Sequence, residues 1–477
     1  TPYQHPTNTL PIWYGGHHDV CISIPIDLFL VLYLYNNSYH EFMHVPRNPP
    51  NIEQLFDNSD MLRCIFSEDV GRYATEFNRR YLHWSEVRFR DTGPFNPDAI
   101  WARMKIVRLD NGSELVFGGR THRYHVTDGM MRMLHEFDLK ASIGLFPENV
   151  DSNRRVYYSV SSLMEESISS SQMEGAVTTT KVAKEMLRRK THPKDRSQRM
   201  IVNNYKAMTF VKQGIDRPLT LEFMMDVHRI VTHETLDEGF IGRFRDNDDV
   251  VVQDVMSGEV FHQPMPHDLI VESLQQLCDF INDETEFIHP LIKGIILHYM
   301  VAYIHPFEDG NGRVARTLFY WYELKSGYWI MEYLALSKYI RQHKGKYEES
   351  YVFVETDDND MNYFILYNLK ALMDSIAVFE DYLKRKIREE RDTRAELAGH
   401  GLNERQIGIV LDLMNGGSIT VKSIQNQYGV SLNTSRSDIK VLIEAGLLKE
   451  CGREVNARVY SWSGVGCNGC RCPTAGD

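Results

Sequence analysis

The sequence feature that most constrains this chain is the run HPFEDGNGR at residues 305–313, which is followed by Arg316. The run combines a base, a carboxylate, two glycines and two arginines within twelve positions. Apolar residues then recur at helical spacing from Val314 to Tyr322, so we expect the run to end at a helix N-terminus. Unpaired N–H groups and the positive end of the helix dipole attract phosphate there. The run therefore predicts a loop that handles a nucleotide polyphosphate.

Each residue type in the run suits a step of that chemistry. The two glycines let main-chain N–H groups approach an anion closely. Arg313 and Arg316 can form forked, charge-assisted hydrogen bonds with phosphoryl oxygens. Asp309 is a hard oxygen ligand suited to Mg²⁺, and His305 can take a proton near neutral pH. Taken singly, a Gly-Asn-Gly is a turn and a histidine before proline is a helix end, so the prediction depends on their fixed order.

The string HPFEDGNGRVAR resembles the signature of the Fic (Fic/Doc) family, H-x-F-x-D/E-G-N-G-R-x-x-R, at every specified position. Proteins of this family mostly move AMP from ATP to a hydroxyl side chain of a target protein and release pyrophosphate. The resemblance implies that His305 deprotonates the target hydroxyl and that Asp309 holds Mg²⁺. It also implies that Phe307 anchors the loop and that Arg313 and Arg316 bind the β- and γ-phosphates. The anion hole would be formed by Gly310, Asn311 and Gly312. Kinase-type relatives usually lack the second glycine, so Gly312 favours nucleotidyl transfer.

A second segment, SSQMEG at residues 170–175, resembles the family's inhibitory motif S/T-x-x-x-E-G/N. The motif precedes the catalytic run, as in autoinhibited members. The resemblance implies that Ser170, Glu174 and Gly175 form the inhibitory site and that Glu174 pairs with Arg316. ATP would then bind in an unproductive pose. The alternative interpretation is an ordinary helix end with Gly175 as its stop.

Two short β-strands separated by a glycine-containing turn precede the catalytic run. In Fic proteins such a flap docks the target segment by strand pairing. A hairpin with only a structural role is the alternative. The preceding Gly242-Arg243-Phe244-Arg245 also resembles the family. The flap residues that we expect to dock a target are Val250, Val251, Val252, Glu259, Val260 and Phe261.

A helix is predicted over Leu291–Ile304, bounded by two prolines. His298 lies seven residues before His305, so both share a helix face. A metal site would need a third ligand at helical spacing, and none is present. We therefore expect His298 to be a packed core histidine.

The fold class expected is mainly α, with an all-helical Fic core, a β-hairpin flap, an α+β N-terminal region and a C-terminal winged helix. A length of 477 residues suggests about three domains. A long helix is expected over Asp360–Glu396. The predicted parts are an N-terminal region (1–150), a catalytic domain with its inhibitory helix (151–375), a helical connector (376–402), a winged helix (403–462) and a disordered tail (463–477).

The winged helix is predicted from helices at 404–414, 421–428 and 433–445, and from wing strands at 446–448 and 458–460. The N-terminal residues of the third helix would read bases in a DNA complex. The segment 403–460 carries seven Lys/Arg against six Asp/Glu, so DNA binding is not compelled. A role in protein docking or dimer formation is equally open.

The charge of the whole chain is −12, which excludes a surface built for nonspecific nucleic-acid binding. No apolar stretch is long enough to span a membrane. The scattered cysteines suit a reducing, cytoplasmic location, and Cys467, Cys470 and Cys472 lack a fourth zinc ligand. We therefore expect an autoinhibited protein adenylyltransferase that uses ATP and Mg²⁺ on a protein target, with a homo-oligomer left open. The alternative is a nucleotide-sensing, DNA-binding transcriptional regulator.

Overall fold

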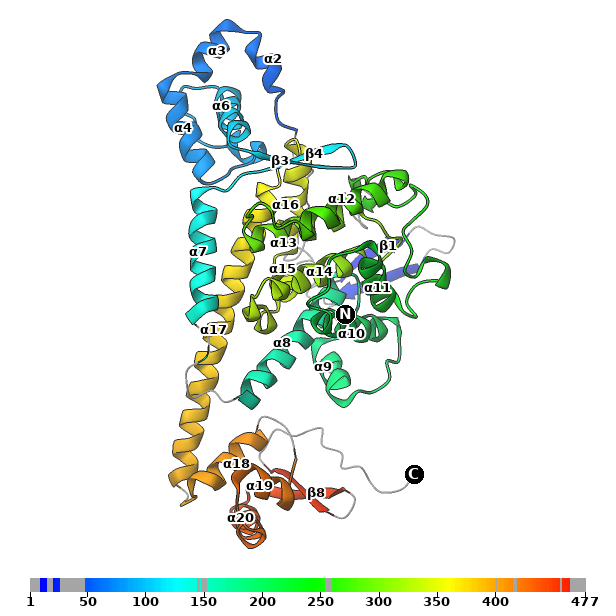
Figure 1. The fold of residues 1–477 in the computed structure, drawn as a ribbon, viewed down its shortest axis with the longest axis vertical. Helices are drawn as coiled ribbons and strands as arrows, with labels where there is room; N and C mark the ends of the chain where they lie inside the picture. The colour runs from blue at the N-terminus through cyan, green and yellow to red at the C-terminus, as the bar shows by residue number, and fades with distance from the viewer. Residues whose placement is uncertain are drawn as a thin grey trace, which may run out of the picture. The chain divides into compact units, whose positions relative to one another are not determined.

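The computed structural model divides the chain into two compact units, Thr1–Ala377 and Val378–Asp477, and each is considered by itself. Helices dominate, and the sheets have two or three antiparallel strands (Figure 1). The prediction of a mainly α protein is confirmed. The boundary falls within one long helix, α17 (Asn362–Gly399), close to the helix predicted over 360–396. The described residues are 9–14, 20–25, 48–143, 146, 152–253, 260–399, 401–414, 418–454 and 457–463.

The N-terminal region contains both helices and strands, as the sequence predicted, and its strands form two antiparallel pairs. Its helices pack around Val70, Trp101 and Met104, which are almost completely buried. The side chain of Ser67 caps the start of α4 by accepting a hydrogen bond from Val70 N. The elements are β1 (Thr9–Tyr14), β2 (Val20–Pro25), α2 (Ile52–Phe56), α3 (Ser59–Ile65), α4 (Glu68–Arg79), α5 (Trp84–Val87), α6 (Pro97–Asp110), β3 (Ser113–Phe117), β4 (Arg120–Tyr124) and α7 (Asp128–Ile143).

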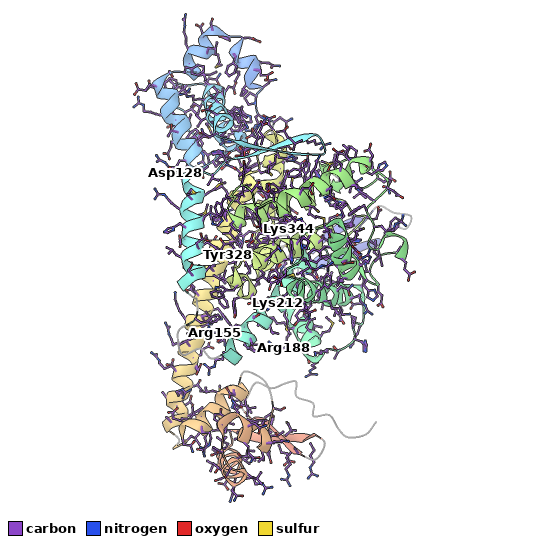
Figure 2. The ribbon with its side chains drawn as sticks, in the orientation of Figure 1. Asp128, Arg155, Arg188, Lys212, Tyr328 and Lys344 are labelled. Carbon is purple, nitrogen blue, oxygen red and sulfur yellow. The ribbon has the colours of Figure 1, made fainter. Side chains whose placement is uncertain are left out.

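Polar contacts join this region to the helices that follow. Tyr328, which is labelled in Figure 2, donates from its OH to Asp138 Oδ1 of α7 at 2.7 Å. Lys105 and Arg108 of α6 both pair with the buried Asp357. These contacts fix α6 and α7 against the core that holds the catalytic run.

The core of the first unit is a helical bundle centred on α13 (Pro290–Ile304) and α14 (Asn311–Lys325), which pack against each other. Nearly every residue of α13 is buried, so this helix is apolar on all sides, as expected for the centre of a bundle. The other elements are α8 (Ser152–Met173), α9 (Thr180–Arg189), α10 (Arg196–Gln213), α11 (Leu221–Thr232), η1 (Glu238–Phe240), β5 (Val252–Gln253), β6 (Val260–His262), η2 (His267–Leu269), α12 (Ile270–Asn282), η3 (Trp329–Tyr333), α15 (Leu336–Gln342) and α16 (Lys344–Thr356).

In the described part of the second unit, three helices and a three-stranded sheet of order β7-β9-β8 follow the end of α17. Its core contains Ile407, Val410, Ile424 and Leu442. The helices fall where the sequence predicted them to within one residue, but β8 starts two residues later and extends further than the predicted wing strand. The elements are α18 (Glu404–Met414), β7 (Ile419–Thr420), α19 (Val421–Tyr428), α20 (Leu432–Glu444), β8 (Leu448–Glu454) and β9 (Ala457–Trp462).

Three further predictions have different outcomes. The domain limits at 150, 375 and 402 stay predictions. The cysteine-containing tail from 464 onward lies outside the described residues. In the described part of the chain, each helix is too short or too polar to traverse a lipid bilayer.

Candidate active site

His305 ends α13 in a left-handed conformation, with φ 51° and ψ 59°. The following Pro306 disfavours a helical conformation at this position, so the helix stops here. The Nδ1 atom of His305 lies 3.2 Å from the carbonyl oxygen of Ala302, which can only accept a hydrogen bond. Nδ1 therefore carries the hydrogen, and Nε2 is left with a lone pair. Burial disfavours the imidazolium ion and lowers the pKa of His305 to about 4. At neutral pH the ring is thus a neutral proton acceptor.

Phe307 anchors the loop that follows His305. Its side chain is completely buried. Asn311 Nδ2 donates to Phe307 O at 2.8 Å, and Phe307 N donates to Asn311 Oδ1 at 2.9 Å. The amide side chain of Asn311 therefore ties the loop together in this conformation, whereas the sequence suggested that it reaches the phosphates.

The glycines sit where the loop enters α14. Gly310 is the N-cap and has φ 90°, a conformation that side-chain-bearing residues rarely adopt. The first helical bond runs from Val314 N to Gly310 O, so the N–H groups of residues 311–313 precede the helical ladder. They lie at the positive end of the helix dipole, which favours an anion. The predicted anion hole therefore has its main-chain donors in place.

Asp309 lies between two guanidinium groups. Its Oδ1 accepts from Gly310 N at 2.6 Å and from Arg313 Nη2 at 3.4 Å. Its Oδ2 accepts from Arg196 Nη2 at 3.2 Å. Arg313 is completely buried, and its Nη1 donates to Val231 O at 2.9 Å. In this conformation Arg313 orients Asp309, and its role as a phosphate ligand stays a prediction.

Arg316 is bound by the predicted inhibitory segment at the end of α8. Its Nη2 donates to Glu174 Oε1 at 2.7 Å, and its Nε donates to Ser170 Oγ at 2.9 Å. Gly175, with φ 90°, turns the chain away directly after Glu174. The guanidinium of Arg316 is almost completely buried, so these contacts occupy the group that the sequence assigned to a phosphate.

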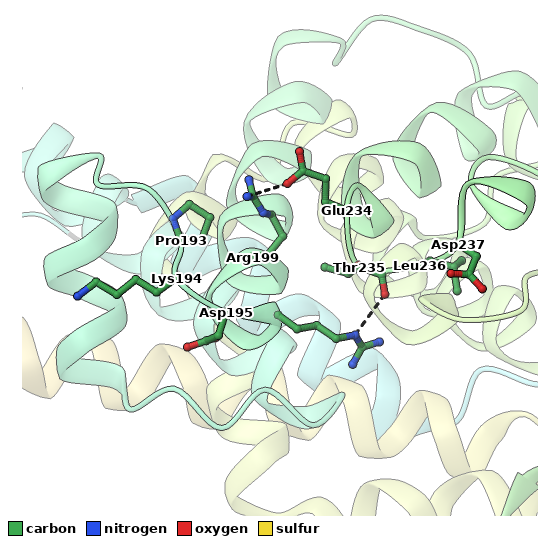
Figure 3. A pocket seen from close by; sticks show the side chains of 9 residues that line it. Pro193, Lys194, Asp195, Arg199, Glu234, Thr235, Leu236 and Asp237 are labelled. Carbon is green, nitrogen blue, oxygen red and sulfur yellow. Dashed lines mark hydrogen bonds and ion pairs between the residues drawn. The ribbon is translucent and has the colours of Figure 1, made fainter.

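A hollow of about 570 Å³ is lined by residues of the segments 193–199 and 234–237, and Figure 3 shows these side chains. Arg196 Nε donates to Thr235 O at 3.2 Å, and the same side chain reaches Asp309 from this hollow. Arg199 pairs with Glu234 at 2.7 Å (Figure 3). Arg196 could not be assigned to the site from the sequence, because it lies more than 100 residues before the run. The residues that line the hollow are Pro193, Lys194, Asp195, Arg196, Arg199, Glu234, Thr235, Leu236 and Asp237.

The flap hairpin is present, but its strands are shifted from the predicted ones. β5 begins at Val252, so Val250 and Val251 precede the strand. β6 contains Val260 and Phe261, while Glu259 lies outside the described residues. Among the described residues the ladder has two pairs, Val252 with His262 and Gln253 with Val260, and the register shifts between them. Alternation of apolar residues cannot locate such a short ladder, because tertiary contacts fix its ends.

Arg245, from the segment noted in the sequence, connects the flap to the catalytic run. Its Nε donates to His305 O at 2.9 Å, and its main-chain N–H donates to Pro306 O at 2.9 Å. Its terminal nitrogens donate to Asn247 O and Met265 O, which lie on either side of the flap. Arg245 is 5% exposed, and it holds both ends of the flap against the catalytic run.

His298 is a completely buried histidine whose Nε2 lies 3.1 Å from Tyr347 OH. Within the described residues, no group of three or more His, Cys, Asp or Glu side chains could hold a metal ion. The structure therefore places His298 as the packed core residue that the sequence favoured.

Residues 218–322 match the model of the Fic/DOC family, and this segment contains the flap, His305 and Arg316. The chain contains a Fic/DOC domain. Two curated relatives share part of it. A protein adenylyltransferase, fic-1 of Caenorhabditis elegans, is 38% identical over 66 residues, which are 14% of this chain and 13% of that protein. Protein adenylyltransferase Fic of Drosophila willistoni is 33% identical over 126 residues, 26% of this chain and 23% of that protein. This chain therefore spans less than a quarter of the length of each of these relatives.

Two solved structures are similar to this chain over a longer range. A Fic-1 structure from Caenorhabditis elegans has a TM-score of 0.49 and 17% identity, and the match covers 67% of this chain and 88% of that one. A Fic family protein from Desulfovibrio desulfuricans has a TM-score of 0.47 and 20% identity, with 72% and 98% covered.

The donor set of the Fic/DOC site fits a magnesium ion. Mg²⁺ keeps several waters and is usually held by one or two carboxylates together with substrate phosphates. Asp309 supplies one carboxylate whose side chain is 34% exposed, beside the main-chain N–H groups of the helix N-terminus. A site of this kind needs the phosphates of a bound nucleotide to complete it.

Proposed function

We propose that this protein is a protein adenylyltransferase that moves AMP from ATP to a hydroxyl side chain of a target protein. The observation that carries the proposal is the arrangement at the end of α13, where a neutral histidine with a lone pair on Nε2 precedes the glycine-capped N-terminus of α14. The curated relatives that match this region are named protein adenylyltransferases. The base supports a transferase, because a protein that only senses a nucleotide has no need of a proton acceptor there.

In the proposed reaction, Nε2 of His305 takes the proton from the target hydroxyl as its oxygen attacks the α-phosphorus of ATP. A new P–O bond forms to the target, and the bond from the α-phosphorus to the bridging oxygen breaks. Pyrophosphate leaves with the electron pair, and the proton stays on His305. A serine or threonine hydroxyl is a poor nucleophile before this transfer, and a positioned base contributes about 10²–10⁴-fold in rate.

The other residues of the site bind and orient the nucleotide. The N–H groups of residues 311–313 face the anion, and Asp309 would hold Mg²⁺. When bound, the ion offsets the charge of the phosphates and helps pyrophosphate to leave. Catalysis then depends on position and charge, because phosphoryl chemistry gives the protein little covalent work. The flap strands would pair with the backbone of the target segment.

We further propose that Glu174 restrains the enzyme. The pairing of Glu174 with Arg316 supports this, because a carboxylate and a γ-phosphate compete for the same guanidinium. Ser170 adds a second contact to the same side chain. Loss of the Glu174 carboxylate would free Arg316 for the phosphate.

The test uses chains with Glu174→Gly and with Glu174→Gly/His305→Ala, incubated with labelled ATP and Mg²⁺. Mass spectrometry then detects added AMP on the chain itself and on proteins of a lysate. We expect labelling by the single variant, weak labelling by the unaltered chain and none by the double variant. Transfer that persists without His305 would refute its role as the base.

For the second unit we propose a winged helix that binds DNA. Asn433, Arg436 and Ser437 lie exposed at the start of α20, where a recognition helix reads base edges. A gel-shift assay at two stated salt concentrations tests this, because phosphate contacts make binding weaker as salt rises.

We propose a cytoplasmic location for the protein, because the free thiols of Cys64 and Cys278 suit that reducing compartment.

A further inference from the structure

One buried histidine outside the Fic signature contacts the catalytic run at two points. His228 lies in α11 and is completely buried. Its Nε2 lies 2.9 Å from Asp309 O. Its ring stacks on Phe307, with the ring centroids 3.9 Å apart and an angle of 3° between the planes. The histidine therefore supports both the anchor of the loop and the main chain of the candidate metal ligand.

The hydrogen bonds of His228 define a single state of the ring. Gly242 N donates to Nδ1 at 2.9 Å, so Nδ1 must accept and carries no hydrogen. The carbonyl of Asp309 can only accept, so Nε2 must carry the hydrogen and donate it. Only the neutral Nε2–H tautomer satisfies both partners. The ring is thus held at both nitrogens and on one face.

The same helix supports the loop at its next turn. Val231 O accepts from Arg313 Nη1, and Arg313 in turn contacts Asp309. A Cβ on Gly310 would lie 3.0 Å from Thr232 Cγ2 and 3.5 Å from His228 Cδ2. The end of α11 is therefore a rigid surface on which residues 309–313 rest.

We propose that His228 is a positioning residue that holds the Asp309 carbonyl, and so directs the Asp309 carboxylate toward the phosphate site. The role of that carboxylate as a metal ligand rests on the proposed function. Without the Nε2–H donor, the Asp309 carbonyl loses its partner, and residues 309 and 310 gain freedom to rotate. Binding of the ion and the nucleotide must then also order the carboxylate, and this loss of conformational entropy weakens their affinity.

The chain offers a matched control in His83. This histidine is also completely buried and stacks on Phe353, with centroids 4.1 Å apart and an interplanar angle of 13°. Its ring nitrogens contact Ser85 and Thr356, neither of which belongs to the catalytic run. A change at His83 therefore reports the cost of losing a buried, stacked histidine without a contact to Asp309.

Substitutions at His228 can separate its two hydrogen bonds. In His228→Gln the terminal amide lies near the position of Nε2 and can still donate to Asp309. In His228→Asn the shorter amide lies near Nδ1 and can serve only Gly242. Both variants lose the ring, so the loss of stacking cancels in a comparison of the two. A difference measured at residues 306–312 reports the bond to Asp309, because the bond to Gly242 lies outside that segment.

The first measurement is amide hydrogen exchange of the ligand-free chains. We expect peptides that cover residues 306–312 to exchange about three- to tenfold faster in His228→Asn than in His228→Gln, since a typical hydrogen bond changes an equilibrium by about that factor. His83→Asn should leave the exchange of these peptides unchanged. Equal exchange in the two His228 variants, or equal acceleration by His83→Asn, would overturn the proposal.

The second measurement is calorimetry of ATP uptake against Mg²⁺ concentration, with each change placed in the Glu174→Gly chain. We expect His228→Asn to raise the half-saturating Mg²⁺ concentration by about three- to tenfold, and His228→Gln by no more than about twofold. If the Glu174→Gly parent takes up no ATP, the proposed function fails, while hydrogen exchange still decides the role of His228. A Mg²⁺ requirement that is the same in both variants would contradict the proposal.

Discussion

Arg316 Nη2 lies 2.7 Å from Glu174 Oε1, and this contact joins the end of α8 to the first turns of α14. Gly312 lies beneath the pair, and a Cβ at that position would overlap Glu174 Oε1. Because Gly312 has no side chain, the Glu174 carboxylate fits beside it. In the proposed function, the same space would let a phosphate reach the N-terminus of α14. In the proposed function, Glu174 and a nucleotide phosphate would therefore compete for the guanidinium of Arg316.

Graded removal of the Glu174 charge should release ATP binding in steps. Charge-assisted hydrogen bonds contribute about 1.5–3 kcal/mol, against about 0.5–1.5 kcal/mol for neutral ones. Glu174→Gln keeps the shape and an acceptor but loses the charge, so we expect its ATP affinity to lie between those of the unaltered chain and Glu174→Gly. Calorimetry with Mg²⁺ measures the order. An affinity for Glu174→Gln equal to that of the unaltered chain would show that charge is not what restrains Arg316.

In the proposed function Arg196 would compete with Mg²⁺ for Asp309, because its Nη2 lies 3.2 Å from Asp309 Oδ2. Its side chain is 60% exposed, and exposed ion pairs contribute about 0–1 kcal/mol. In the Glu174→Gly background, Arg196→Ala should therefore lower the half-saturating Mg²⁺ concentration by about two- to fivefold and leave the melting temperature unchanged. Arg199→Ala is the control, because Arg199 lines the same hollow but pairs with Glu234. A weaker requirement for Mg²⁺ in both variants would point to the general charge of the hollow instead.

The contiguous part of the site could be predicted from the sequence. Main-chain geometry from His305 to Gly312 is set by adjacent residues, namely a proline that stops one helix and a glycine that starts the next. The contacts of His228 and Arg196 with Asp309 could not be predicted, because they join residues 81 and 113 positions apart. A histidine with apolar neighbours at helical spacing looks like any core residue until its partner is known.

The same distinction applies to the fold. Helices α18 and α19 begin and end where the amphipathic pattern predicted, because their periodicity is a local property. The flap strands were misplaced by one or two residues, since Arg245 and the contact of His262 Nε2 with Tyr303 O fix their position. Buried charges such as Asp357 gave no sequence signal, because their partners come from distant helices.

The lowered pKa of His305 predicts the acid limb of the pH profile. With its pKa at about 4, the free enzyme keeps the base neutral well below the ordinary histidine value of 6.5. We expect kcat/KM of the Glu174→Gly chain to stay constant down to about pH 5 and to fall below it. The profile of kcat should bend at a higher pH, because bound phosphates favour the imidazolium ion. A bend of kcat/KM near pH 6.5 in a chain that remains folded would contradict a buried, neutral base.

Asp357 is a buried carboxylate that compensates two buried cations. Lys105 Nζ lies 2.7 Å from Asp357 Oδ1, and Arg108 Nη1 lies 3.4 Å from Oδ2. Removing one partner of such a group leaves uncompensated charge, so Asp357→Asn should lower the free energy of unfolding by about 3–5 kcal/mol. Urea unfolding measures the change. Asp60→Asn, at the exposed pair with Arg63, is the control and should have no measurable effect.

Glu323 should make the stability of the fold fall with rising pH. Its side chain is completely buried in α14, and both carboxylate oxygens lack a hydrogen-bond partner among the described residues. Burial raises its pKa well above 4.5, so the folded chain keeps the proton while the unfolded chain releases it. The stability that this group contributes is present below pH 4.5 and is lost as the pH rises toward the folded-state pKa.

Glu323→Gln removes the titration and keeps the volume of the side chain. The melting temperature of this variant, relative to that of the unaltered chain, should therefore increase steadily between pH 5 and pH 8. Glu272→Gln, on the exposed face of α12, is the control, and its difference from the unaltered chain should not change with pH. A constant difference for Glu323→Gln would mean that the carboxyl group is ionised in the fold. The space beside Gly294, where a Cβ would overlap Glu323 Oε1, would then have to hold a charge without a counterion.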